Sequence, residues 1–115
     1  MNWIALESEN QISEIIDRST STAVVIFKHS TSCAISSIAK NRLVNSWDIP
    51  EDDIIPYYLD ILKFRNISNQ IADRFDVVHE SPQVLLIKNQ ECIYENSHLD
   101  INIPELKEAI THKVI

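Results

Sequence analysis

The stretch that decides the fold is residues 23–36, AVVIFKHSTSCAIS, in which an apolar run ends in a short polar loop and a cysteine. Residues 23–28 are mostly apolar and rich in β-branched side chains, which is typical of a central strand covered on both faces. After the polar residues 29–32, Cys33 stands where the next helix is expected to begin. Four apolar positions mark that helix: Ile35, Ile38, Ala39 and Leu43. The stretch therefore predicts a β-strand that leads into a helix, with a cysteine at the junction.

Cys33 is the residue best placed for chemistry. Unpaired N–H groups and the positive end of the helix dipole stabilise a thiolate at a helix start. Lys28 and His29 add positive or titratable charge nearby, and the hydroxyls of Thr31 and Ser32 can donate to sulfur. An ordinary thiol has a pKa of about 8.5, and a depression of about two units makes it mostly thiolate at pH 7. We therefore expect Cys33 to be reactive; the alternative is a small buried side chain that happens to lie near a helix start.

Cys33 and Ser36 have the spacing of a dithiol redox motif in which a hydroxyl replaces the second thiol. Two thiols at these positions could close a disulfide within the chain, whereas a hydroxyl cannot. The motif is therefore limited to one thiol that accepts a group and needs an outside thiol to release it.

The rest of the chain alternates strands and helices and ends with a hairpin and a helix. Besides residues 23–28, short strands are predicted at 3–6, 54–59, 84–87 and 92–94, and helices around 12–16, 35–43, 67–75 and 102–110. Pro56 favours the edge of the sheet for its strand, because proline cannot donate to a ladder. Asn89 and Gln90 form the hairpin turn, and Asn102 caps the last helix. This order predicts an α/β protein with a mixed central β-sheet flanked by helices, as in the thioredoxin fold.

The pair Ser81-Pro82 directly precedes the fourth strand, after an extended segment that includes His79 and Glu80. A proline here can open the strand with a trans or a cis peptide bond. In thioredoxin-type folds a cis proline at this place lies beside the reactive cysteine, and the preceding residue offers its backbone to the substrate. Together with Cys33, the pair favours the cis form.

Length and composition exclude several classes of function. The 115 residues predict a single domain over 1–115, and the absence of glycine rules out a Gly-rich phosphate loop. A formal charge of -7 opposes nucleic-acid binding, which needs a dense basic face. No stretch approaches a membrane span or has the pattern of a signal peptide, so we expect a cytosolic protein without a membrane partner.

The second cysteine, Cys92, is expected to pack in the core. Pro82 begins its strand beside the active cysteine, and seven residues, about 23 Å at ~3.3 Å each, separate it from the turn near Cys92. A disulfide needs Cα atoms about 4.4–6.8 Å apart. A bridge between Cys33 and Cys92 within one molecule should therefore not form.

The chain resembles the monothiol bacilliredoxins, thioredoxin-like proteins of bacteria that use bacillithiol. The matching segments are residues 27–36, FKHSTSCAIS; 57–75, YYLDILKFRNISNQIADRF; and 79–98, HESPQVLLIKNQECIYENSH. Gln90, where the family usually has glycine, is a departure that affects the hairpin turn only. The similarity extends from Trp3 to the final helix.

The resemblance implies a role for each matching residue. It makes Cys33 the nucleophile, Ser36 the second motif position, and Ser81-Pro82 the substrate-facing loop, with His29, Lys28, His79 and Glu80 around the site. It also implies the reaction, removal of bacillithiol from mixed disulfides on client proteins, with bacillithiol as co-substrate and a second low-molecular-weight thiol for regeneration. No bound cofactor is implied.

Two other readings remain open at this stage. One is a non-catalytic thioredoxin-like module, modified at Cys33 under oxidative stress, that binds a partner. The other is a thioredoxin-like domain without a redox role. A metal site is not expected, because the four histidines lack metal-ligand spacing, and the Cys-Gly-Phe-Ser motif of cluster-binding glutaredoxins is absent.

Overall fold

The structure is a computed structural model that describes residues 3–30 and 34–111. Three residues predicted for the site, Thr31, Ser32 and Cys33, lie outside the described residues. Within the described part, no helix is long and apolar enough to cross a membrane.

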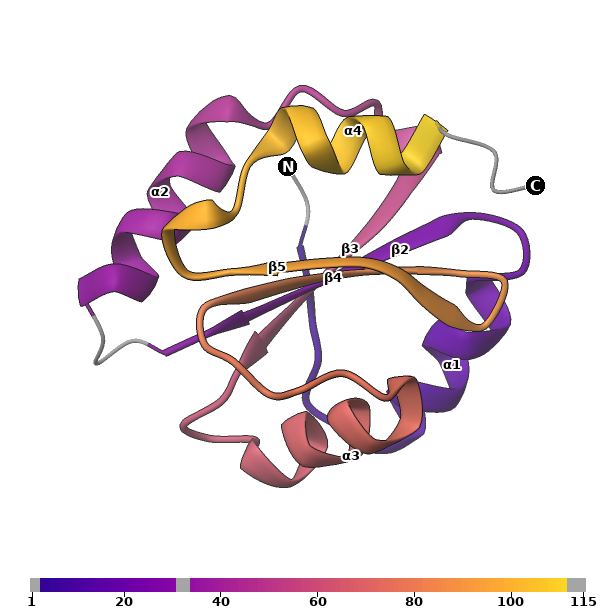
Figure 1. Cartoon of the computed structure of the whole chain (residues 1–115). Helices are drawn as coiled ribbons and strands as arrows, with labels where there is room; N and C mark the ends of the chain where they lie inside the picture. Colours follow the sequence, from indigo (N-terminus) through magenta and orange to yellow (C-terminus); the bar gives the residue numbers. More distant parts are fainter. Residues whose placement is uncertain (1–2, 31–33, 112–115) are drawn as a thin grey trace.

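The chain forms a five-stranded sheet with helices on both faces (Figure 1). Its strands are β1 (Ile4–Ala5), β2 (Ala23–His29), β3 (Ile54–Asp60), β4 (Gln83–Lys88) and β5 (Glu91–Ser97). Its helices are α1 (Asn10–Arg18), α2 (Ala34–Ser46), α3 (Arg65–Phe75) and α4 (Ile103–Thr111), with the short 3-10 turns η1 (Glu51–Asp53) and η2 (His98–Asp100). The predicted alternation of strands and helices is confirmed, with ends displaced by one to three residues in most elements.

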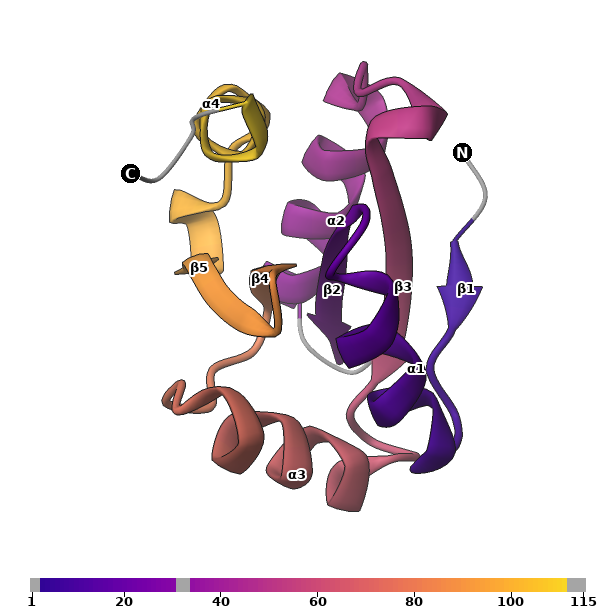
Figure 2. The same ribbon diagram turned by 90° about the vertical axis from the view of Figure 1, so that its right-hand side faces the viewer.

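The strand order is β1-β3-β2-β4-β5. The strands β1, β3 and β2 are parallel, as right-handed strand–helix–strand units require, while β4 is antiparallel to both β2 and β5. Helices α1 and α3 cover one face of the sheet, and α2 and α4 cover the other (Figures 1 and 2). The predicted α/β fold with a mixed sheet is therefore confirmed.

The strand β2 lies at the centre of the sheet and is buried along its whole length. Its side chains alternate between the two faces. Val24 and Ile26 pack in the core beneath α1 and α3, whereas Val25 and Phe27 pack in the core beneath α2 and α4. This alternation decides which way the polar residues at the end of the strand point.

The prediction that Pro56 places its strand at the sheet edge is wrong, because β3 lies between β2 and β1. The outer neighbour β1 is only two residues long and pairs with Tyr57 and Tyr58. Pro56 therefore lies just before the part of β3 that pairs with β1. Its missing N–H group removes no hydrogen bond between β3 and the described residues of β1.

The buried face of helix α2 differs from the face that the spacing of its apolar residues predicts. Ile35 and Ile38 are 45% and 46% exposed, whereas Ser36, Ala39 and Leu43 are at most 2% exposed. The sheet-facing stripe therefore includes a serine, and two isoleucines lie on the solvent side beside the start of the helix.

The hairpin between β4 and β5 turns through two residues in the left-handed region. Asn89 has φ 52° and Gln90 has φ 70°, the geometry of the turn that matches the twist of paired strands. The end of α1 holds this turn, since Ser19 accepts from the backbone N–H of Asn89 at 2.8 Å and, through Oγ, from that of Gln90 at 2.9 Å.

Replacing Gln90 by glycine should raise the free energy of unfolding by about 0.5–1 kcal/mol. A residue other than glycine in the left-handed backbone conformation costs about 1–2 kcal/mol. Glycine avoids this cost, but its greater conformational entropy in the unfolded chain offsets about half of the gain. Urea denaturation measures the change as a higher midpoint with an unchanged slope. Glu91→Gly, one residue later in β5, is the matched control and should lower the midpoint; a fall for Gln90→Gly as well would contradict the prediction.

Candidate functional site

Two groups of buried polar side chains flank the end of β2, one on each face of the sheet. Within a strand, neighbouring side chains point to opposite faces, so Lys28 lies on the α3 side and His29 on the α2 side. Burying a polar group is costly unless it is hydrogen-bonded. Six polar residues here are at most 7% exposed: Lys28, Ser68 and Gln83 on the α3 side, His29 and Ser36 on the α2 side, and Ser30 directly after the strand. Buried polar residues are therefore concentrated at the end of β2, just before Cys33 in the chain.

On the α2 side, Ser36 joins the start of the helix to the end of the strand. Its Oγ accepts from the backbone N–H of Ser30 at 3.0 Å and lies 2.6 Å from Nδ1 of His29. Burial, reinforced by the charge of Lys40, lowers the pKa of His29, so the imidazole is neutral at pH 7. The Ser36 hydroxyl can therefore donate to Nδ1.

On the α3 side, Lys28 and Ser68 meet a histidine from the segment between α3 and β4. The Nζ of Lys28 lies 3.3 Å from Nδ1 of His79, and the Oγ of Ser68 lies 3.0 Å from the same nitrogen. Burial, and then the charge of Arg65, lowers the pKa of Lys28 to about 8. Burial, and then the charge of Lys28, lowers the pKa of His79. The sequence predicts that Lys28 supplies charge near Cys33; the contact that the structure describes is with His79, in the loop of residues 79–82.

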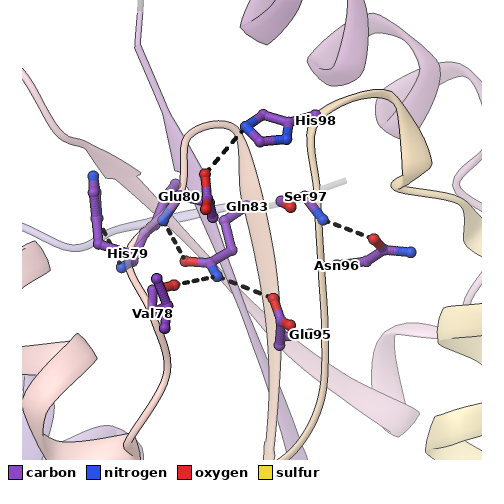
Figure 3. A network of polar contacts seen from close by, with 9 residues as sticks. Val78, His79, Glu80, Gln83, Glu95, Asn96, Ser97 and His98 are labelled. Carbon is purple, nitrogen blue, oxygen red and sulfur yellow. Dashed lines mark hydrogen bonds and ion pairs between the residues drawn. The ribbon is translucent and has the colours of Figure 1, made fainter.

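The side chain of Gln83 holds the same loop to the sheet (Figure 3). Its Nε2 donates to the carbonyl oxygen of Val78 at 3.0 Å and to Oε2 of Glu95 at 3.1 Å, and its Oε1 accepts from the backbone N–H of Glu80 at 3.4 Å. At the surface, the Glu80 carboxylate pairs with Nε2 of His98 at 3.2 Å. Sequence reasoning missed Gln83. A signal was present, since a glutamine opens an otherwise apolar strand directly after a proline.

The peptide bond between Ser81 and Pro82 is cis, as predicted. Pro82 is buried, and its carbonyl oxygen accepts from the backbone N–H of His98 at 2.9 Å. The Oγ of Ser81 is buried and has no hydrogen-bond partner among the described residues. A buried hydroxyl without a partner is uncommon in proteins and is suited to a ligand that brings its own polar group.

The register of the sheet brings the two predicted parts of the site together. Lys28 pairs with Gln83 across β2 and β4, so the loop of residues 79–82 lies beside the end of the strand that leads to Cys33. The described members of the predicted site, on β2, α2 and this loop, therefore share one end of the sheet. The role of Cys33 as nucleophile stays a prediction, as do those of Thr31 and Ser32.

Cys92 is a free cysteine on the α1 and α3 side of the sheet. It is partly buried against that core, opposite Ile87, and its Sγ donates to the carbonyl oxygen of Tyr94 at 3.3 Å. Burial raises the pKa of the Cys92 thiol to about 11. The expected packing role is confirmed.

The Cys92 thiol should resist alkylation in the folded protein. With a pKa of about 11, about one thiol in a thousand is ionised at pH 8, and only the thiolate reacts. Iodoacetamide labelling followed by peptide mass analysis should show modification of Cys92 at least about a hundredfold slower in the folded than in the urea-unfolded chain. Equal rates in the two states would contradict the assigned burial.

Metal binding has no support in residues 3–30 and 34–111, where no three His, Cys, Asp or Glu side chains are grouped to hold an ion.

Comparison with known proteins assigns the family. Residues 4–106 match the model of the family described as monothiol bacilliredoxin BrxC. A solved structure described as a candidate oxidoreductase with a thioredoxin fold is 34% identical, with a TM-score of 0.78 over 92% of this chain and 91% of that chain.

Two thioredoxins share the fold at lower identity. Thioredoxin from Malassezia sympodialis is 19% identical, with a TM-score of 0.73 over 96% of this chain and 89% of its own. Thioredoxin f2 from Chlamydomonas reinhardtii is 14% identical, with a TM-score of 0.68 over 95% of this chain and 94% of its own. With its cis-Pro82 loop beside the end of β2, the chain belongs to the monothiol bacilliredoxin family, thiol oxidoreductases with a thioredoxin-like fold.

Proposed function

We propose that this protein removes bacillithiol from mixed disulfides on other proteins through Cys33. The observation that supports it best is the environment of Ser36. At the position where a dithiol enzyme has its second thiol, this chain has a fully buried hydroxyl held by Ser30 and His29. That hydroxyl cannot attack a disulfide, so a group accepted by Cys33 stays there until an outside thiol removes it.

The reaction exchanges one sulfur–sulfur bond for another. The Cys33 thiolate attacks the bacillithiol sulfur of the mixed disulfide, the bond to the client breaks, and the electron pair leaves on the client thiolate, which then takes a proton from water. A second low-molecular-weight thiol attacks the adduct in the same way and restores Cys33. No bound cofactor is needed, and bacillithiol acts as co-substrate. The proposed compartment is the cytosol, where thiols are kept reduced.

The loop before β4 is proposed to receive the client. Its Ser81 hydroxyl is buried next to cis-Pro82 and has no partner in the part of the chain that the structure describes, and Gln83 fixes the backbone of Val78 and Glu80. A rigid backbone with one unused hydroxyl is suited to hydrogen bonds with the chain around a client cysteine.

A single-turnover reaction tests the proposal. A client protein carrying bacillithiol on one cysteine is mixed with an excess of the reduced protein, and both masses are followed in time. The client should lose the bacillithiol mass while the peptide containing Cys33 gains it. A client that stays modified, while Cys33 takes up free bacillithiol only when an oxidant is added to accept the two electrons, would instead indicate a non-catalytic module that is modified under oxidative stress.

A further inference from the structure

The amine of Lys28 is fully buried on the α3 side of the sheet, where a cation is costly. None of the ion pairs found among residues 3–30 and 34–111 includes it. Its described hydrogen bond is to Nδ1 of His79, at 3.3 Å, and Ser68 reaches the same nitrogen at 3.0 Å. An apolar side chain would fill this place without the free-energy cost of burying a cation. The contact with His79 is therefore a candidate for a functional role.

The chemistry of the two groups fixes the proton on the imidazole. An ammonium group only donates hydrogen bonds, so Nδ1 of His79 must accept, and the Ser68 hydroxyl must then donate as well. A neutral imidazole that accepts at Nδ1 carries its proton on Nε2. The Nε2–H bond points away from Nδ1, and hence away from Lys28.

His79 lies in the loop that leads to cis-Pro82, and this loop is held in place on the same side of the sheet. Gln83, directly opposite Lys28 in the register, fixes the backbone on either side of His79 through Val78 and Glu80. The imidazole is half-buried, so its Nδ1 edge faces the protein interior while part of the ring stays open to solvent. The backbone and the side chain of His79 are thus restrained independently.

We propose that Lys28 is a positioning residue of the thiol-transfer site, whose contact with Nδ1 makes His79 present an Nε2–H donor from the substrate-facing loop to the departing thiolate. This inference rests on the proposed role of Cys33 in thiol exchange and deepens it. As Cys33 attacks, one sulfur–sulfur bond forms and one breaks, and the electron pair leaves on the outgoing sulfur. The Nε2–H group hydrogen-bonds to that sulfur and keeps its proton, and water protonates the thiolate after release.

The charges around the pair set the pH range in which the arrangement holds. Lys28 is faced by Arg65 from α3 and Cys92 from β5, and His79 is faced by Lys28, by Arg65 and by Glu80 of its own loop. With a Lys28 pKa of about 8 and a lowered His79 pKa, the ammonium and the neutral imidazole coexist around pH 7. Above pH 8 the amine loses its proton and no longer forces Nδ1 to accept, whereas in acid Nδ1 takes a proton and the contact breaks.

Long-range proton–nitrogen correlation spectra of the wild-type imidazoles test the tautomer without any variant. His79 should carry its proton on Nε2 at pH 7, with an Nδ1 resonance displaced by hydrogen bonding. In Lys28→Met that displacement should decrease and the His79 titration midpoint should move to higher pH, because a nearby cation is lost. Lys63→Met removes an exposed lysine and should change neither. A proton on Nδ1 in the wild type, or an unchanged midpoint in Lys28→Met, would overturn the proposal.

Two small disulfides separate a positioning role from general damage to the site. Dithiodipyridine releases a weakly basic sulfur that needs no stabilisation, whereas hydroxyethyl disulfide releases an ordinary alkyl thiolate. Lys28→Met should react about tenfold more slowly than wild type with the alkyl disulfide, the scale of one hydrogen bond to a charged group, and within about twofold with dithiodipyridine. Lys28→Arg, which keeps a donor, should recover part of the lost rate.

Equal slowing of Lys28→Met with both disulfides would indicate a damaged site, and no slowing with either would remove the role of Lys28; each outcome overturns the inference. Neither probe contains bacillithiol. If the proposed bacillithiol transfer failed, the comparison of the two disulfides would still test the role of Lys28. The two failures can therefore be told apart.

Discussion

Ser36→Cys should release bacillithiol from the Cys33 adduct without any added thiol, at least about a hundredfold faster than the wild type does. The substitution restores the spacing of a dithiol motif, and an attack by a thiol three residues away in the same chain has a high effective concentration. His29 favours the reaction, since its neutral Nδ1 now lies 2.6 Å from the Ser36 oxygen and would accept the proton of an introduced thiol. The measurement is the mass of the adduct in time, without reductant.

The neighbouring residue offers a matched control for this prediction. Ser37 is exposed and one position further along α2, where a thiol has the wrong spacing. Ser37→Cys should retain the adduct as the wild type does. Ser36→Cys should also lose about 1–2 kcal/mol of stability, because sulfur makes weaker hydrogen bonds than oxygen to Ser30 and His29. Wild-type protein that sheds the adduct as fast as Ser36→Cys would reveal a hidden resolving group and end the one-thiol mechanism.

Cys33→Ser should abolish both labelling at this position and bacillithiol transfer, with a fall in rate of at least about a thousandfold. A serine hydroxyl is not ionised at neutral pH and forms no mixed disulfide, so nothing remains to accept the group. The single-turnover reaction with a bacillithiolated client measures the loss.

Cys92→Ser is the control for the Cys33 variant. It removes the other thiol of the chain, which is partly buried, and should keep the transfer rate within about twofold while it lowers the free energy of unfolding by about 1 kcal/mol. Transfer that survives Cys33→Ser but not Cys92→Ser would reverse the assignment of the nucleophile.

The order of the elements was predictable because each carries its own local pattern. The run of residues 23–28 is apolar without interruption, as a strand covered by helices on both faces must be. At the end of the chain, the side chain of Asn102 accepts from the backbone N–H of Glu105 at 2.9 Å, which confirms the predicted cap. Such signals depend on neighbours in sequence and need no knowledge of the tertiary structure.

Burial within α2 was not predictable in the same way. Apolar spacing marks Ile35 and Ile38 as helix residues, yet the sheet covers Ser36, because its hydroxyl is satisfied by a histidine at the end of β2. Whether a serine can be buried depends on that partner, which lies seven positions earlier in the chain. The hydrophobic pattern alone carries no information about such pairing.

The surroundings of Lys28 show the same limit over a longer distance. Strand alternation places Lys28 and His29 on opposite faces, and the sequence contains that information. The partner of Lys28 is His79, 51 positions further along the chain, and only the antiparallel pairing of β2 with β4 brings it there. The second half of the site thus follows from strand register, which a single sequence does not determine.

Because Lys28 and His29 point to opposite faces of the sheet, the site contains two separate sets of hydrogen bonds. In the described structure, the hydrogen bonds of Ser36 and His29 share no partner with those of Lys28, Ser68 and His79, and the sheet lies between the two sets. Free-energy effects of substitutions in unconnected sets usually add. Under the proposed mechanism, substitutions of Lys28 or His79 would therefore change the departure of the thiolate, while the contacts of Ser36 with Ser30 and His29 on the other face are kept.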